Sequence, residues 1–191
     1  MRALGLTVAL GLVACTPRGT AHDRGGASPA MDGGADADVA EASPPDAGPA
    51  KEALPTFPSD ELTARARHLL EAIAKDDPSL ATDIVFPRDA YIEAKDAADP
   101  GKQWDDKVMS AFQREVHLLH KRTKGVERAE LVSLDMGAPI SQVVPKKRDM
   151  TLTLWRVRHC RLEFTIDGKA LRFDLAELMS WRGAWYVFDL R

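Results

Sequence analysis

The sequence predicts an α+β domain over residues 55–191, with N-terminal helices packed on a bent antiparallel sheet of about four strands. Apolar residues recur at helical spacing in the first half of this region. In the second half, apolar and polar residues alternate in runs separated by turn dipeptides. Helices followed by hairpin-connected strands are typical of the α+β class. A signal peptide (1–14) and a disordered tether (15–54) are expected before the domain.

The first expected helix begins after Ser59, whose side chain can cap it, with Asp60 and Glu61 favourable in the first turn. A second, short helix is expected to start at Asp77-Pro78, because Pro is well suited to the first helical position. The apolar face of the first helix is formed by Leu62, Ala66, Leu69, Leu70 and Ile73.

Two further helices are expected before the strands. One is short and covers residues 88–95, and a longer one runs from Trp104 to about Thr123. Between them, Asp99-Pro100-Gly101 is interpreted as a turn.

The strands are expected at residues 128–136, 151–166, from 169 onward, and 184–190. Asp167-Gly168 is a strong signal for a two-residue hairpin, and Arg182-Gly183 suggests a second turn. Gly137-Ala138-Pro139 is expected to end the first strand.

The first fifteen residues have the parts of an export signal: one Arg, an apolar run, and small residues before a Cys. The segment is too short for an ordinary membrane span. Leu12-Val13-Ala14-Cys15 resembles the lipobox of bacterial lipoproteins. That resemblance implies that Cys15 carries lipid, including palmitate, and anchors the protein to a membrane of the cell envelope. Because Thr16 replaces the Asp that retains family members in the inner membrane, the outer membrane is favoured.

The segment from residue 15 to 54 is rich in Ala, Gly, Pro and Asp, and lacks Leu, Ile, Phe, Tyr and Trp between Gly19 and Ala50. It holds seven acidic and three basic residues. Such a chain buries too little apolar area to offset its ordering entropy, so we expect a disordered spacer.

The ending Trp181-Arg182-Gly183-Ala184-Trp185-Tyr186-Val187-Phe188 and the order of elements resemble the nuclear transport factor 2-like (cystatin-like) superfamily. The resemblance implies helices lying in the concavity of a bent sheet. Its members include enzymes, ligand-binding proteins and assembly scaffolds, so it implies no single reaction.

Strict alternation places Arg156 and Arg158 on the face of Leu152, Leu154 and Cys160, where two guanidinium groups would project into one concavity. Because a buried Arg needs a partner, Asp174 or Glu177 on the next strand is expected to pair with them. The sequence therefore predicts that Arg156, Arg158 and Asp174 bind a small anionic molecule. The alternatives are a bulge that turns both Arg residues outward and a purely structural cluster of ion pairs.

Three other features have alternative interpretations. His117 and His120 have the spacing of zinc ligands, but a surface pair near a helix end is the simpler interpretation, so no metal is predicted. Cys160 is expected to be a buried apolar residue rather than a nucleophile. The basic run Pro145-Lys146-Lys147-Arg148 is expected to be a solvated loop rather than a lipid-phosphate site.

Residues 55–191 hold 22 acidic and 22 basic side chains, which argues against a nucleic-acid partner. The favoured hypothesis is a non-enzymatic envelope lipoprotein that binds an envelope protein or a small ligand, without a cofactor. The alternative is a small-molecule hydrolase or isomerase that uses Arg156, Arg158, Asp174 and His159.

Overall fold

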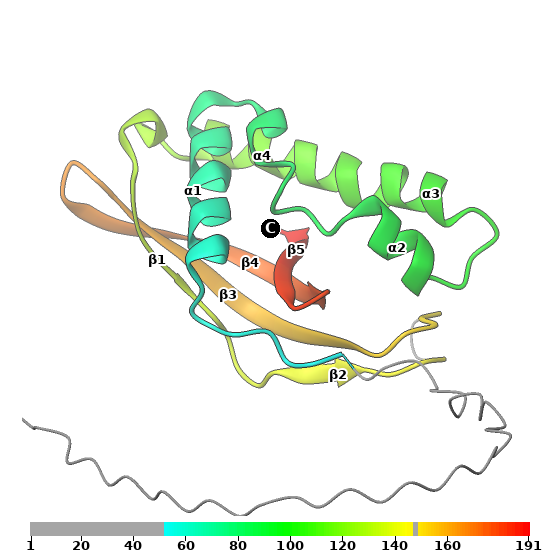
Figure 1. Cartoon of the computed structure of the whole chain (residues 1–191). Helices are drawn as coiled ribbons and strands as arrows, with labels where there is room; N and C mark the ends of the chain where they lie inside the picture. The colour runs from blue at the N-terminus through cyan, green and yellow to red at the C-terminus, as the bar shows by residue number, and fades with distance from the viewer. Residues whose placement is uncertain (1–51, 147–148) are drawn as a thin grey trace, which may run out of the picture. The chain divides into compact units, whose positions relative to one another are not determined.

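The protein is described by a computed structural model that covers residues 52–146 and 149–191, and it has the α+β fold (Figure 1). The expected signal peptide, Cys15, nearly all of the expected tether, and Lys147 and Arg148 of the basic run lie outside these residues. In the described part of the chain, no helix is long and apolar enough to cross a membrane.

The helices lie on one side of the sheet (Figure 1). They are α1 (Asp60–Lys75), η1 (Pro78–Ala81), α2 (Arg88–Ala94), α3 (Pro100–Gln103), η2 (Trp104–Met109), α4 (Ser110–Arg122) and η3 (Val126–Arg128). As expected, Ser59 caps α1 by accepting a hydrogen bond from the Leu62 backbone N–H (3.2 Å), and Asp77 caps η1 ahead of Pro78.

The interpretation of Asp99-Pro100-Gly101 as a turn is wrong, because these residues begin a helix. The Asp99 carboxylate accepts a hydrogen bond from the Lys102 backbone N–H (2.8 Å), and Pro100 takes the first helical position. This is the same Asp-Pro start as at η1. The helical path then continues through η2 into α4.

Element η2 is a π-helical turn, in which the Ser110 backbone N–H donates to the Asp105 carbonyl five residues earlier. Trp104 fixes this turn, since its indole N–H donates to the Phe86 carbonyl (2.7 Å). Turns of this kind are rare and occur frequently at functional sites.

The sheet has five antiparallel strands in the order β1-β3-β4-β5, and β2 also pairs with β3. Their bounds are β1 (Glu130–Asp135), β2 (Ser141–Val143), β3 (Leu154–Ile166), β4 (Lys169–Trp181) and β5 (Ala184–Leu190). Both predicted hairpin turns are present. Asp167-Gly168 and Arg182-Gly183 have positive φ at both positions (51°, 77° and 48°, 79°), which matches the twist of the flanking strands.

Strict alternation fails in the first half of β3. Leu154, Val157 and Cys160 are all buried, at intervals of three rather than two residues. His159 has a left-handed backbone (φ 59°), which breaks the pleat between Arg158 and Cys160. From Cys160 to Ile166 the alternation is regular.

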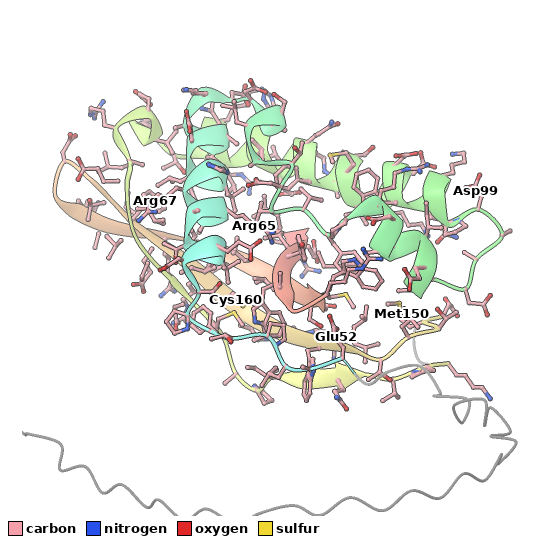
Figure 2. All side chains as sticks on the ribbon, viewed as in Figure 1. Glu52, Arg65, Arg67, Asp99, Met150 and Cys160 are labelled. Atoms are coloured by element: carbon pink, nitrogen blue, oxygen red, sulfur yellow. The ribbon has the colours of Figure 1, made fainter. Side chains whose placement is uncertain are left out.

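The segment before α1 packs on the sheet. The Glu52 carboxylate accepts a hydrogen bond from the Ser180 hydroxyl (2.6 Å), and its carbonyl accepts one from the Trp155 indole (2.9 Å). Among the described residues, contacts with the sheet therefore include residue 52, which precedes the domain boundary expected at residue 55. Figure 2 shows Glu52 beside the strands and Cys160 in the interior.

Candidate functional site

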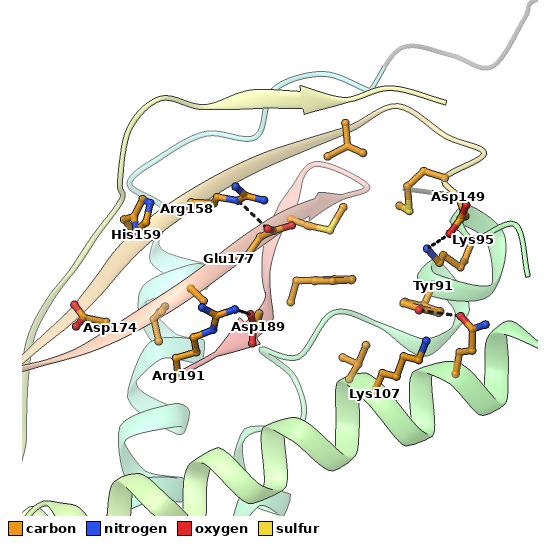
Figure 3. A pocket seen from close by; sticks show the side chains of 18 of the residues that line it. Tyr91, Lys95, Lys107, Asp149, Arg158, His159, Asp174, Glu177, Asp189 and Arg191 are labelled. Atoms are coloured by element: carbon orange, nitrogen blue, oxygen red, sulfur yellow. Dashed lines mark hydrogen bonds and ion pairs between the residues drawn. The ribbon is translucent and has the colours of Figure 1, made fainter. Parts of the chain in front are cut away.

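A pocket of about 1040 Å³ lies between the helical layer and the sheet (Figure 3). Tyr91 of α2 and Lys107 of η2 contribute to its helical wall, and Arg158 and Glu177 lie on the opposite wall, from β3 and β4. Its size is at the upper end of the range for small-molecule sites.

Glu177 is the one acidic or basic side chain that is buried within the described residues, with 7 % of its surface exposed. The β3–β4 register places it opposite Arg158. The Arg158 Nε donates to Glu177 Oε2 at 3.1 Å. Taking a carboxylate out of water is costly unless it is paired, so the ion pair with Arg158 offsets part of the cost of burying Glu177.

The pocket also has an apolar wall. Tyr91 and Phe188 stack at 6.2 Å between ring centroids, with 17° between the ring planes. Met179, Met150 and Val143 are buried beside them. Burial raises the pKa of the Tyr91 hydroxyl above its usual value, and this hydroxyl donates a hydrogen bond to Gln103 Oε1 (3.5 Å).

Most acidic side chains of the pocket have a basic partner. Besides Glu177, the pairs are Asp149 with Lys95 (3.6 Å), Asp174 with Arg172 (3.9 Å) and Asp189 with Arg191 (3.2 Å). In contrast, Lys107 and Arg161 form no ion pair with any carboxylate in the described part of the chain. The pocket lining therefore contains two basic side chains whose charge no carboxylate of the described residues neutralises.

Two of the three predicted site residues line the pocket in the structure. Arg158 and Asp174 line the pocket, whereas Arg156 does not. Arg156 is partly buried and lies opposite Ser141 and Met179 in the sheet register. The two guanidinium groups therefore do not form one site. Arg158 takes Glu177 as its partner, while Asp174 pairs within its own strand.

A histidine–carboxylate pair in the pocket would favour the alternative enzyme hypothesis. Within the described residues, such pairs form between His68 and Asp83 (2.7 Å) and between His117 and Asp76 (2.9 Å). Neither pair lines this pocket. His159 does line it, but no carboxylate of the described residues forms an ion pair with its ring.

The remaining candidates have structural partners. His117 contacts Asp76, and the His120 ring contacts the Ile73 carbonyl (2.9 Å), so both tie α4 to the end of α1. No cluster of three potential metal ligands occurs in residues 52–146 and 149–191. Cys160 is fully buried, and burial raises the pKa of its thiol.

Sequence reasoning missed the helical wall of the pocket. Lys107 and Gln103 belong to the helical path that starts at Asp99, and the Asp-Pro signal there was available. Nothing in the sequence marked Tyr91 as a pocket residue, because a single aromatic residue on a short helix usually belongs to the hydrophobic core.

No protein-family model matches the chain, and no curated protein or solved structure is significantly similar to it.

Proposed function

We propose that this protein is a lipid-anchored cell-envelope lipoprotein whose folded unit is a non-enzymatic binding module for a small molecule. The observation that carries the binding role is the Glu177–Arg158 pair in the wall of a pocket of about 1040 Å³. A buried charge contributes little to stability in comparison with a well-packed apolar residue. Ligand recognition accounts better for the position of the Glu177–Arg158 pair in the wall of a cavity.

The π-helical turn supports the same proposal. Lys107 and Val108 of η2 both line the pocket. A local departure from regular helix geometry places side chains where an α-helix would not. The resemblance to the nuclear transport factor 2-like superfamily adds weight, since ligand-binding proteins are among its members.

The anchor is proposed from the lipobox Leu12-Val13-Ala14-Cys15. Two or three acyl chains on Cys15 would hold the protein firmly, because each buried methylene contributes about 0.8 kcal/mol. A flexible tether would then let the binding module sample the space next to the membrane.

Native mass spectrometry of the full chain, extracted from its host membrane in non-ionic detergent, tests the binding role. We expect the native mass to exceed the denatured mass by that of one small molecule. The variant Ala176→Phe, which places a ring in the pocket, is expected to lose this excess. Ala170→Phe, on an exposed position of the same strand, is expected to keep it. An excess that survives Ala176→Phe would place the ligand elsewhere and refute the proposal.

Metabolic labelling with an alkyne analogue of palmitate tests the anchor separately. The full chain and Cys160→Ser are expected to take up label, whereas Cys15→Ser is not. The chain contains two cysteines, so Cys160→Ser is a matched control. Equal labelling of Cys15→Ser would refute lipidation at Cys15.

A further inference from the structure

We infer that the pocket takes an organic anion with an apolar body, and that Arg158 binds its carboxylate or phosphate group; this inference rests on the proposed binding function.

Glu177 holds Arg158 in position through one nitrogen of the guanidinium group and leaves its other donors available for a ligand. Glu177 engages only the Nε atom, at 3.1 Å. The two terminal nitrogens of the guanidinium have no hydrogen-bond partner in the described part of the chain. The side chain is 44 % exposed, while that of Glu177 is 9 % exposed. A carboxylate on one edge of an Arg orients the planar group and leaves its other donors for a second acid, which they match in geometry.

The balance of charge favours an anion over a cation. Six Lys or Arg and five Asp or Glu line the pocket. Four of the five acids are in ion pairs, and the fifth, Asp96, is exposed at the rim. Figure 3 shows Arg158 on the sheet and Lys107 on the helix at opposite sides of the pocket. An entering anion would thus meet positive groups from both layers.

The apolar surface specifies the rest of the ligand. The Tyr91–Phe188 stack and the buried Met179 lie in the same pocket as Arg158. A fully hydrated inorganic anion would leave this surface in contact with water. A molecule with an aromatic or aliphatic body would cover it and add the hydrophobic contribution of the buried area.

Three probes that share one ring system test the inference by isothermal titration calorimetry on the full chain in non-ionic detergent, with detergent alone as the blank. The probes are 2-naphthoate, 2-naphthalenemethanol and 2-naphthylmethylammonium. We expect 2-naphthoate to bind at least about tenfold more tightly than the alcohol, since hydrogen bonds to charged groups are strong, and the ammonium to bind most weakly. Equal binding of acid and alcohol, or tighter binding of the ammonium, would overturn the inference.

The variant Arg158→Gln should weaken 2-naphthoate binding by about tenfold or more and leave the affinity for the alcohol unchanged. Arg114→Gln removes an exposed arginine of α4 that pairs with Glu115 and does not line the pocket, and it should change the affinity less than threefold. If Arg158→Gln loses the near-ultraviolet circular dichroism of the folded chain, Arg158→Gln/Glu177→Gln replaces it, because this double variant removes the buried carboxylate together with its Arg158 partner. Retention of 2-naphthoate affinity in either Arg158 variant would overturn the assignment of Arg158.

The two proposals fail in different ways. Preference for the alcohol or the ammonium refutes the anion but keeps a binding module. Absence of binding by all three probes also refutes the anion, and the native mass of the full chain then decides whether the pocket holds a ligand at all.

Discussion

Gly137 lies directly against the irregular stretch of β3. A Cβ built on this glycine would lie 1.8 Å from the Arg158 carbonyl oxygen and 2.9 Å from the carbonyl carbon of His159. Both atoms belong to the backbone, so neither can rotate away. The missing side chain of Gly137 permits this close approach, and the left-handed backbone of His159 breaks the pleat beside Arg158.

We accordingly expect Gly137→Ala to lower the free energy of unfolding by about 2–3 kcal/mol, as overpacking against fixed atoms does. Urea denaturation measures this change. Gly101→Ala is the control, because a Cβ there meets only the tip of the exposed Arg88 side chain and Ala favours the helix. A Gly137→Ala variant as stable as Gly101→Ala would show that Gly137 approaches the backbone of β3 less closely than described.

The chemistry of the Cys160 thiol follows from its burial. Burial raises the pKa of its thiol, so at any given pH a smaller fraction is thiolate than for a free cysteine. We expect no measurable reaction with Ellman's reagent at pH 8 in the folded chain, and one equivalent of thiol per chain after denaturation. Rapid reaction of the native protein would contradict burial, and two equivalents would contradict lipidation of Cys15.

At the scale of elements, the Asp99 cap matters beyond its own helix. It starts the path α3–η2–α4, which provides Lys107 and Val108 to the pocket. Asp99→Ala should lower the free energy of unfolding by about 1 kcal/mol, and Asp99→Asn should restore most of it. Thermal unfolding followed by circular dichroism measures both. Equal stability of the Asp99→Ala variant and the wild-type chain would indicate that Pro100 alone determines where α3 begins.

The elements show which signals in the sequence are reliable. Hairpins at Asp167-Gly168 and Arg182-Gly183 were predictable, because their left-handed positions select few residue types. Strand β2 was not predictable, since Ser141–Val143 is three residues long and its pairing depends on β3. Arg156 and Arg158 were assigned to one site by alternation, but alternation does not show which side chains reach a cavity, and of the two only Arg158 lines the pocket. Glu177 was named as a possible partner of Arg158, but its burial is a tertiary property.

At the scale of the whole molecule, the question is where the tether ends and the folded unit begins. Composition places the boundary between residues 54 and 55, because the last tether residues lack the aromatic residues of a core. The contacts of Glu52 with Ser180 and Trp155 place it earlier. The difference is physical: one polar residue can dock on a sheet through hydrogen bonds without any hydrophobic signal in the sequence.

Endoproteinase Glu-C distinguishes the two boundaries, since it cleaves after Glu and the chain offers Glu41 and Glu52 in this region. Proteolysis needs a locally open chain, so cleavage after Glu52 should be at least about tenfold slower than after Glu41 in the native protein. Ser180→Ala removes the hydroxyl that donates to the Glu52 carboxylate and should speed cleavage after Glu52 alone. Ser79→Ala, whose hydroxyl bonds only to Asp77, is the matched control and should change neither rate. Intact-mass spectrometry over the time course follows both cuts. Equal rates at Glu41 and Glu52 in the native chain would move the boundary back to residue 55 and extend the reach of the tether.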